Sequence, residues 1–527
     1  MKIRRNQSLP VLLVGGLAAG LLSGCGTQDD AGGTGKAVVM GMSDEIQATD
    51  PASGYDPGSW LLFNNVFQSL MSFPKGSSTP QPEAAKECRF ESGGSTTYRC
   101  TLRSGLTFSN GDKLTARDVK FSFDRVLKIN DELGPGPLLT SIGKVETPDD
   151  RTVVFHLKFP DATFPSKIAS GAGSIVDHRQ YSFDKLRTDG KAVGSGVYKL
   201  DSYNKKQAVF SVNSRYEGTA QVKNSGMTMK LFHNNQKALG AALKKGDIDL
   251  AYRGLTAKDI ESIQDSVTGD KGIDVVEGSS AEVQHLVFNM KDPVAGRLAV
   301  RKAMAYLINR NALVTDVYRS TAEPLYSIVP AGIASHRTAF FDMYGDNPKP
   351  DKAAQTLRSA GITSKVKLTL WSTPSRYGPA TDEEFGAIAK QLNASGLFDA
   401  TVKSVPYGQY EKGIAAGKYG VYVKGWVPDY PDADNFTSPF FGKGNVLGNN
   451  YSNKTIINNL IPAESSATDR TTASGDFSEL QDIVATDLPI LPLWQGKQYA
   501  VAHDDITGLE WTLDASTVFR FWEISKN

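Results

Sequence analysis

The sequence predicts an α/β protein of two or three domains. Its 527 residues exceed the length of one ordinary domain, and a hydrophobic content of 40% is enough to form real cores. Strand-like runs alternate with helical patterns along the chain, which is typical of a sheet covered by helices. A glycine-rich stretch at 190–200 is too irregular for a helix or strand, and it indicates a hinge or crossover between domains.

The charge balance excludes one class of partner. The formal net charge is +1, and no long run of basic or acidic residues occurs. We therefore expect no nucleic-acid partner and no electrostatic steering by the molecule as a whole. No cofactor motif is present, and we expect no cofactor.

The first 25 residues differ from the rest. Lys2, Arg4 and Arg5 precede an apolar run at 11–22 that is too short to span a membrane, and a Leu-Ser-Gly-Cys sequence ends at Cys25. This order resembles a bacterial lipoprotein signal, with cleavage before Cys25 and lipidation of its thiol. The alternative is an ordinary secretory signal with an incidental cysteine.

We expect the remainder to be a soluble body tethered to the outer face of the cytoplasmic membrane, at the cell surface or in the periplasm. Residues 26–36 are predicted to be a flexible linker. Cys88 and Cys100 flank a Gly-Gly turn signal, and in an exported protein this pattern predicts a disulfide between two hairpin strands. A metal site would need further Cys or His nearby, and none is present.

The first half of the chain contains a well-marked helix at 114–127, where Thr115 and Asp118 form a capping box ahead of apolar residues at helical spacing. The full set of elements expected before residue 280 is strands at 38–41, 98–103, 152–158, 208–212, 227–232 and 248–251, and helices at 61–70, 114–127 and 237–245.

The second half repeats strand and helix. At 381–393 we expect a helix with Thr381 and Glu384 as its capping box. The other expected elements are strands at 284–289, 365–371, 419–425, 498–503 and 518–524, and helices at 297–309, 352–360, 407–416 and 477–485. The last strands are expected to return to the first domain, and the strand ends of the β-α-β order are expected to face a ligand.

Residues 425–436, GWVPDYPDADNF, follow one of these strands directly. Pro428 and Pro431 cannot continue a ladder, and the three aspartates favour turns, so we predict a rigid loop at a strand end, the usual place for ligand groups. Asp429 is predicted to receive the positive end of a small ligand, or else to cap its own turn. Asp432 and Asp434 are assigned turn-forming or surface roles.

Four segments, at 101–126, 193–200, 288–313 and 425–436, together resemble the extracytoplasmic solute-binding proteins of ABC importers that handle dipeptides, oligopeptides and nickel. The resemblance implies the large three-domain variant of the type II-like periplasmic-binding-protein fold, with discontinuous lobes, a hinge, and a ligand enclosed between domains I and III. The implied ranges are 37–75, 191–280 and 488–527 for domain I, 76–190 for domain II and 281–487 for domain III.

The resemblance also implies two ligand-binding residues. Asp429, in the Gly-Trp-x-x-Asp pattern, matches the acid that pairs with a ligand's α-amino group, and Arg376 is similar to the arginine that dipeptide-binding members use for the carboxylate. Enclosing a zwitterion is costly unless each charge meets an opposite one, and a carboxylate and a guanidinium fork supply that. Aromatic residues that could line the space, or simply pack in the core, are Tyr55, Trp60, Trp371, Tyr377, Trp426 and Tyr430.

The expected function is that of a lipid-anchored, monomeric receptor that captures a peptide by domain closure and passes it to an ABC permease with its ATPases. An oligosaccharide, a nickel chelate or another small molecule is the alternative ligand, although the six histidines form no spaced ligand pair. A secreted hydrolase is the remote alternative. We expect no enzyme, because no G-x-S-x-G, H-E-x-x-H or Cys-His arrangement occurs.

Overall fold

The computed structural model describes residues 35–91, 94–233, 235–265, 272–319, 321–374, 376–378 and 380–527. The predicted signal segment, Cys25 and nearly all of the predicted flexible linker at 26–36 lie outside these ranges. Within the described ranges, every helix is too short or too polar to span a membrane.

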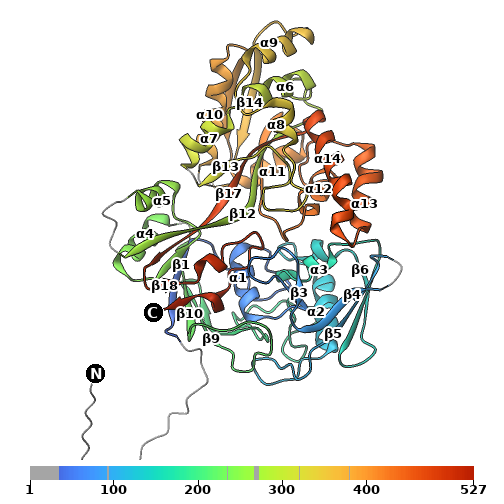
Figure 1. Ribbon diagram of the computed structural model, residues 1–527, viewed down its shortest axis with the longest axis vertical. Coiled ribbons are helices and arrows are strands. Elements are labelled where there is room, and N and C mark those ends of the chain that lie inside the picture. The colour runs from blue at the N-terminus through green and yellow to red at the C-terminus, as the bar shows by residue number, and fades with distance from the viewer. Residues whose placement is uncertain are drawn as a thin grey trace, which may run out of the picture. The chain divides into compact units, whose positions relative to one another are not determined.

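One large mixed sheet forms the centre of the molecule, and helices cover it (Figure 1). The α/β class predicted from the sequence is therefore confirmed. Along the sheet, the strands follow the order β15 (Phe398–Ser404), β14 (Val366–Ser372), β16 (Val421–Trp426), β12 (Ile273–Phe288), β17 (Ile490–His503), β11 (Leu250–Tyr252), β1 (Val38–Met42), β10 (Gly226–Leu231), β9 (Gln207–Val212) and β8 (Tyr198–Asn204), with β13 (Ala322–Pro324) paired to β17.

Two long strands connect the two ends of this sheet. β12 and β17 pair antiparallel from Ile273 opposite His503 to Val287 opposite Ile490, with register shifts between Ser279 and Val283 and again beyond Gln284. β17 also pairs with β11, and β12 pairs with β16, so the two strands run from the β1 region into the region of β14 and β16 (Figure 1). They are the structural link between predicted domains I and III.

A separate four-stranded sheet lies in the range predicted for domain II, in the order β4 (Ala85–Phe90), β5 (Thr97–Leu102), β7 (Thr152–Leu157) and β6 (Ile142–Glu146). Cys88 and Cys100 stand opposite each other in β4 and β5 and form a disulfide, which confirms that prediction. The helix beside this sheet is α2 (Ala116–Ile129), and the backbone N–H of Thr115 donates to Asp118 at 2.8 Å, so the predicted capping box is confirmed.

The remaining elements follow the expected alternation closely. The short strand pairs are β2 (Met71–Ser72) with β3 (Gln81–Pro82) and β18 (Ile506–Thr507) with β19 (Ser525–Lys526). The helices are α1 (Pro57–Val66), α3 (Phe164–Lys167), α4 (Gln236–Lys245), α5 (Ala257–Gln264), α6 (Leu298–Leu307), α7 (Arg310–Leu313), α8 (Ala339–Tyr344), α9 (Pro350–Ser359), α10 (Thr381–Ala394), α11 (Tyr407–Ala415), α12 (Asp434–Phe441), α13 (Ile461–Ser466) and α14 (Ser474–Asp487).

The glycines of the predicted crossover serve close packing. The N–H of Gly196 donates to the carbonyl of Val66 at 2.8 Å, and a Cβ added at Gly194 would lie 2.1 Å from that same oxygen. The segment therefore fits against the end of α1 because Gly194 and Gly196 carry no side chain.

Three large groups of buried apolar residues lie in different parts of the chain. One spans 281–494, a second combines 38–67, 176–252 and 500–524, and a third occupies 52–175. Tyr430, which comes from the 425–436 segment, packs in the third group. The exact domain limits stay a prediction.

The predicted capping box of α10 is wrong. Ala380 is the N-cap, and the Thr381 hydroxyl donates to the carbonyl of Gly378 at 2.8 Å. Glu384 is fully buried and accepts hydrogen bonds from Trp494 Nε1 at 3.0 Å, the Tyr318 hydroxyl at 3.1 Å and the Gln284 side chain. The carboxyl group is therefore used by the core, and the box pattern at this helix start is incidental.

The predicted strand at 518–524 is also wrong, although this segment does pack with the first domain's core as expected. It forms irregular backbone followed by a short 3₁₀ turn at Phe521–Glu523. Two buried asparagines satisfy its backbone groups: Asn65 bonds the carbonyl of Phe519 and the N–H of Phe521, and Asn224 bonds the carbonyls of Phe521 and Ile524. These asparagine side chains satisfy backbone groups that a neighbouring strand would otherwise bond, so this apolar segment can be buried without joining a sheet.

Candidate functional site

The segment that follows β16 forms a compact turn before the next helix. Trp426 ends the strand, opposite Val283 of β12, and the chain leaves the sheet immediately, as the two prolines require. The Asp432 side chain accepts from the N–H of Asp434 at 2.9 Å, and α12 begins at Asp434. The loop predicted to run to residue 436 therefore ends earlier, because Asp432 organises the helix start.

Asp429 lies at the centre of this turn and is 8% exposed. Its Oδ1 accepts a hydrogen bond from the Tyr55 hydroxyl at 2.6 Å, and its Oδ2 accepts one from Asn435 Nδ2 at 3.2 Å. Its own N–H donates to Asn435 Oδ1 at 3.1 Å, which fixes the turn. No ion pair joins Asp429 to any described residue.

This carboxylate is buried and forms no salt bridge with a described residue. Burial raises the pKa of Asp429, and the hydrogen bonds from Tyr55 and Asn435, together with the charge of Lys167, offset part of that rise. A carboxylate offers about four acceptor positions, and Tyr55 and Asn435 occupy only two of them. The described contacts therefore leave acceptor positions of this carboxylate open to a further donor.

Tyr55 belongs to the connection between β1 and α1, far from Asp429 in the sequence. Its side chain is 38% exposed, although its hydroxyl is engaged with Asp429. Trp60 lies beside it, with ring centroids 5.5 Å apart, and donates from Nε1 to the carbonyl of Gly54 at 3.1 Å. A Cβ added at Gly171 would lie 2.9 Å from the Trp60 ring, so Trp60 is packed against domain II.

Trp426 and Tyr430 flank Asp429 in the chain and are held by the same turn. Trp426 donates from Nε1 to Asn435 Oδ1 at 2.8 Å. Tyr430 is buried, donates its hydroxyl hydrogen to Asp434 at 2.9 Å, and has the ammonium of Lys167 5.9 Å from its ring centroid. Tyr430 thus joins domain III to domain II.

Trp371 and Tyr377 lie on two different features of domain III. Trp371, in β14, stacks on Tyr419 with ring centroids 4.2 Å apart. Tyr377 packs on the first residue of the 425–436 segment, because a Cβ added at Gly425 would lie 3.0 Å from its ring. The structure therefore brings Tyr377 to the strand end that leads into Asp429, and no described contact does so for Trp371.

Arg376 is exposed, and its guanidinium lies 5.1 Å from the centroid of the Tyr407 ring. It forms no ion pair with any residue in the described ranges, and none of its described contacts involves Asp429. Its proposed role toward a ligand carboxylate stays a prediction.

The surface role expected for Asp434 is wrong, because its side chain is only 6% exposed. Burial raises its pKa, and the nearby Lys167 opposes that rise. Asp432 has the expected turn-forming role, and it also receives two hydrogen bonds from Arg470, at 2.8 and 2.9 Å. Close by, burial and the charge of Asp434 raise the pKa of Glu464 to about 9.

Domain II and domain III meet directly beside this turn. The N–H of Ala162 donates to the carbonyl of Ser465 at 2.8 Å, and the Ser95 hydroxyl approaches the same oxygen at 3.3 Å. Lys167 is held by Asp161 at 2.8 Å on the domain II side. The turn is therefore contacted by residues from the other two domains.

Asn435 and Lys167 were not predicted from the sequence. Asn435 stands six positions after Asp429 and accepts from or donates to three groups of the turn. Its place in the Asp-Asn-Phe end of the segment was a usable signal, since asparagine often closes turns. Lys167 lies in another domain, and no pattern in the sequence connects it with Asp429.

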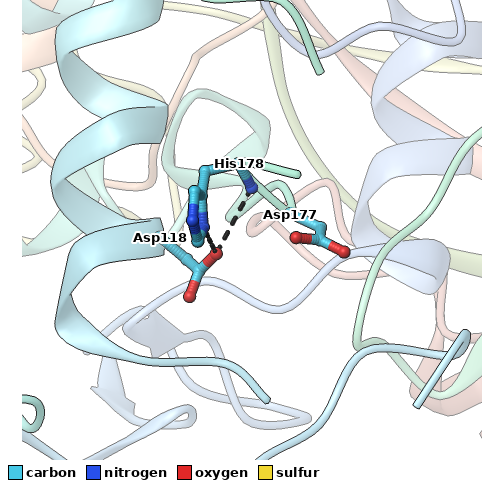
Figure 2. Close-up of side chains that lie close together, drawn as sticks. All are labelled: Asp118, Asp177 and His178. Carbon is cyan, nitrogen blue, oxygen red and sulfur yellow. Dashed lines mark hydrogen bonds and ion pairs between the residues drawn. The ribbon is translucent and has the colours of Figure 1, made fainter. Parts of the chain in front are cut away.

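A group of potential metal ligands lies in domain II (Figure 2). Asp118, Asp177 and His178 place one ligand atom each within 4.8 Å of one another. His178 Nδ1 lies 2.6 Å from Asp118, and Arg179 Nε donates to Asp177 at 2.6 Å. Because donors of the chain itself already form hydrogen bonds with these carboxylates, we interpret the group as a structural network.

A pocket of about 380 Å³ opens elsewhere on domain III, beside the end of α11. Its lining includes Asn289, Asp292, Gly417 and Asn450. None of the residues predicted to bind a ligand lines it.

Comparison with known proteins gives a consistent result. The sequence model of the bacterial extracellular solute-binding proteins, family 5, matches residues 79–448. The chain belongs to this family. Its members are extracytoplasmic binding proteins of ABC importers and are not enzymes.

Individual relatives agree with the family over almost the whole length. The di/tripeptide-binding protein 3 of Pseudomonas aeruginosa is 25% identical over 517 residues, which cover 92% of this chain and 93% of that protein. A Helicobacter pylori periplasmic binding protein in complex with the peptide STSA superposes with a TM-score of 0.74 at 20% identity, covering 93% and 98% of the two chains.

A dipeptide-binding protein of Pseudoalteromonas sp. SM9913 in complex with Met-Leu has a TM-score of 0.77 at 18% identity, covering 93% of this chain and 100% of that one. These likenesses establish the fold, which is the type II-like periplasmic-binding-protein fold predicted from the sequence.

Proposed function

We propose that this family member captures di- or oligopeptides outside the cytoplasm and delivers them to an ABC permease. The ligand lies between domains I and III, and closure of domain III on domain I encloses it. The names of peptide-binding relatives at about 25% identity support a peptide over other solutes.

The observation that carries the proposal is the state of Asp429. It is buried, accepts hydrogen bonds from Tyr55 and Asn435, and has no cationic partner among the described residues. Burying an unpaired carboxylate is costly, and the α-ammonium of a peptide supplies both the missing charge and further hydrogen-bond donors. The peptide carboxylate needs a cation in turn, and Arg376 is the residue that the family resemblance proposes for it.

The contact from Tyr55 to Asp429 gives closure a physical basis. Tyr55 stands on the domain I side and Asp429 on the domain III side, so their hydrogen bond forms only when the two domains meet. A ligand ammonium bound to Asp429 next to Tyr55 adds contacts to the closed form and shifts the population toward it.

We propose that the protein is a monomer held at the membrane by a lipid on Cys25. The basic start, the short apolar run and the Leu-Ser-Gly-Cys sequence support the lipid anchor. A single lipid chain binds membranes reversibly, and lipoprotein anchors with several acyl chains hold more firmly. Mass spectrometry of the mature amino terminus tests it: a lipidated Cys25 is expected, and an unmodified terminus at another position contradicts it.

Isothermal titration of the mature protein with di- to pentapeptides tests the ligand class. Heat of binding with at least one peptide length is expected, and none with oligosaccharides or nickel chelates. Binding of a sugar or a chelate in place of every peptide would overturn the assignment. Mass spectrometry of ligand released by denaturation identifies what co-purifies.

A further inference from the structure

A charged side chain, Arg253, stands where two neighbouring strands of domain I end. β1 and β11 run parallel and end side by side, where the N–H and hydroxyl of Ser43 donate to the carbonyl of Arg253 at 3.0 and 3.2 Å. The connection that leaves β1 carries Asp44 and then Tyr55, which reaches Asp429. Arg253 follows β11 and therefore lies beside the end of β1, and it is the loop after β1 that meets domain III.

The backbone at Arg253 is held in an unusual conformation. Its φ is +54°, which is uncommon for a residue with a side chain, and the next residue, Gly254, has a φ of +120°. A Cβ at Gly254 would lie 2.2 Å from the Ser43 hydroxyl oxygen. Such conformations are unfavourable and persist where the surroundings fix them, often at ligand sites.

The preceding residue anchors this turn. Tyr252 stacks on Phe519 with ring centroids 4.2 Å apart, and its hydroxyl donates to Gln498 at 3.2 Å. Both contacts come from the last part of the chain, which is folded back on domain I. The position of Arg253 is thus set by rigid elements on either side.

The guanidinium of Arg253 is oriented but not saturated. Its Nε donates to Asp44 at 2.5 Å, and its side chain is 32% exposed. The Tyr252 side chain also interacts with this guanidinium, whose two Nη groups make no hydrogen bond of good geometry to a described residue. Glu282, in the part of β12 that crosses between the domains, is the other charged neighbour: burial raises the pKa of Glu282, and Arg253 opposes that rise. Asp44 in turn raises the pKa of Arg253, so this guanidinium stays charged.

Arg253 and Arg376 differ in how they are held. Arg376 is exposed and lies over an exposed aromatic ring, Tyr407, without a hydrogen-bonded carboxylate. Arg253 has one edge fixed by Asp44 and another edge unused. A guanidinium that is oriented before binding loses less entropy when it takes up a carboxylate, so Arg253 is the better prepared of the two.

We propose that Arg253 binds a carboxylate of the peptide ligand through its unused Nη groups, with Asp44 as its positioning residue. This inference rests on the proposed function, and it names the domain I group that complements Asp429 across the two domains. The carboxylate comes from the peptide's carboxyl terminus or from an acidic side chain, and both sources offer the same planar pair of oxygens.

The test compares a peptide that binds the wild-type protein with its carboxyl-terminal amide, by titration calorimetry. The amide is expected to bind about 10- to 100-fold more weakly to the wild type, as for loss of a hydrogen bond to a charged group. In Arg253→Gln, acid and amide are expected to bind equally. If an Asp or Glu side chain is the source, the amide keeps its affinity, and replacing that residue by Asn or Gln produces the loss.

Arg337→Gln is the matched control, because Arg337 also forms an ion pair through Nε with an aspartate, Asp482, at 3.0 Å on the surface of domain III. It should retain the wild-type preference. If a thermal unfolding assay shows that Arg253→Gln does not fold, Asp44→Asn replaces it as the test. Asp44→Asn keeps the guanidinium but removes the carboxylate that orients it, and a weaker preference for the acid over the amide is expected.

Two results overturn the inference while leaving peptide binding intact. One is an unchanged acid preference in Arg253→Gln, and the other is loss of that preference in Arg376→Gln alone. If the wild-type protein binds no peptide of any kind, the proposed function fails first, and the role of Arg253 fails with it.

Discussion

Two regions of this protein contain buried carboxylates, and the two regions differ in the donors that surround these carboxylates. In domain II, Asp118 and Asp177 are surrounded by donors from their own neighbourhood, including Thr115, His178 and Arg179. In domain III, Asp429 receives hydrogen bonds from two neutral groups and no described cation. The first network is complete, and the second has room for one more charged partner.

The segment that most clearly identifies the family is therefore not the segment proposed to bind the ligand. The segment that contains Asp118 resembles the family most clearly, yet its polar groups hold a helix and a loop together. The charge that lacks a partner is at Asp429, in a shorter and less distinctive pattern. A ligand site is therefore better located by counting unmet charges than by the strength of a motif.

The largest effect is expected at Asp429. Asp429→Ala should weaken peptide binding by about 100-fold or more, because the ligand ammonium would be buried without its counter-charge. Titration calorimetry measures this, with circular dichroism to confirm folding. Wild-type affinity in the variant would place the ammonium elsewhere.

Asp118 should show the opposite pattern. Asp118→Ala removes the capping box of α2 and the partner of His178, and we expect the free energy of unfolding to fall by about 2–3 kcal/mol. Peptide affinity should stay within about twofold. Urea unfolding and calorimetry on one preparation check both numbers, and a large loss of affinity with unchanged stability would reverse the assignment of the two regions.

Glu384 provides a third kind of buried carboxyl, sealed among neutral donors. Burial raises its pKa to about 8, whereas an unfolded glutamate titrates near 4.5. The folded state therefore holds more protons between these values, so stability is full below about pH 4.5 and declines as pH rises toward 8.

The midpoint of thermal unfolding should consequently be lower at pH 8.5 than at pH 5.5. A loss of about 1 kcal/mol in the free energy of unfolding lowers the midpoint by about 2–4 °C in a medium-sized domain, and by less in a chain of this length. Glu464, with a pKa raised to about 9, adds to the same trend. Glu384→Gln should reduce the slope. An unchanged slope in that variant would show that Glu384 does not titrate in this window.

The smallest effect is expected at Tyr55. Tyr55→Phe removes one hydrogen bond to Asp429 and leaves the ring beside Trp60. A loss of peptide affinity of about 3- to 10-fold is expected, which is the range for one ordinary hydrogen bond. Loss of the same size in Phe90→Leu, far away in domain II, would indicate a general packing effect.

Much of the fold could be predicted from local patterns. The capping box at Thr115 and Asp118, the disulfide between Cys88 and Cys100 and the glycine end of α4 at Gly246 depend on neighbours in sequence, and each is present. The capping-box prediction at Thr381 and Glu384 failed because a tryptophan and a tyrosine that are distant in sequence donate hydrogen bonds to the glutamate.

Predictions failed where long-range partners decide the conformation. The apolar end of the chain is irregular because Asn65 and Asn224 satisfy its backbone, and no local signal reports that. Within the site, Asp429 could be selected from its prolines and turn residues. Arg253 could not, because its role depends on a left-handed backbone and on a parallel neighbour more than 200 positions earlier.

The pairing of Asp429 with a ligand ammonium is tested most directly by a double comparison. A peptide and its N-acetylated form are titrated into the wild-type protein and into Asp429→Asn. The wild type should bind the free peptide at least about 100-fold more tightly than the acetylated one, and Asp429→Asn should bind both with similar, weak affinity. Equal binding of the two peptides by the wild type would contradict the account.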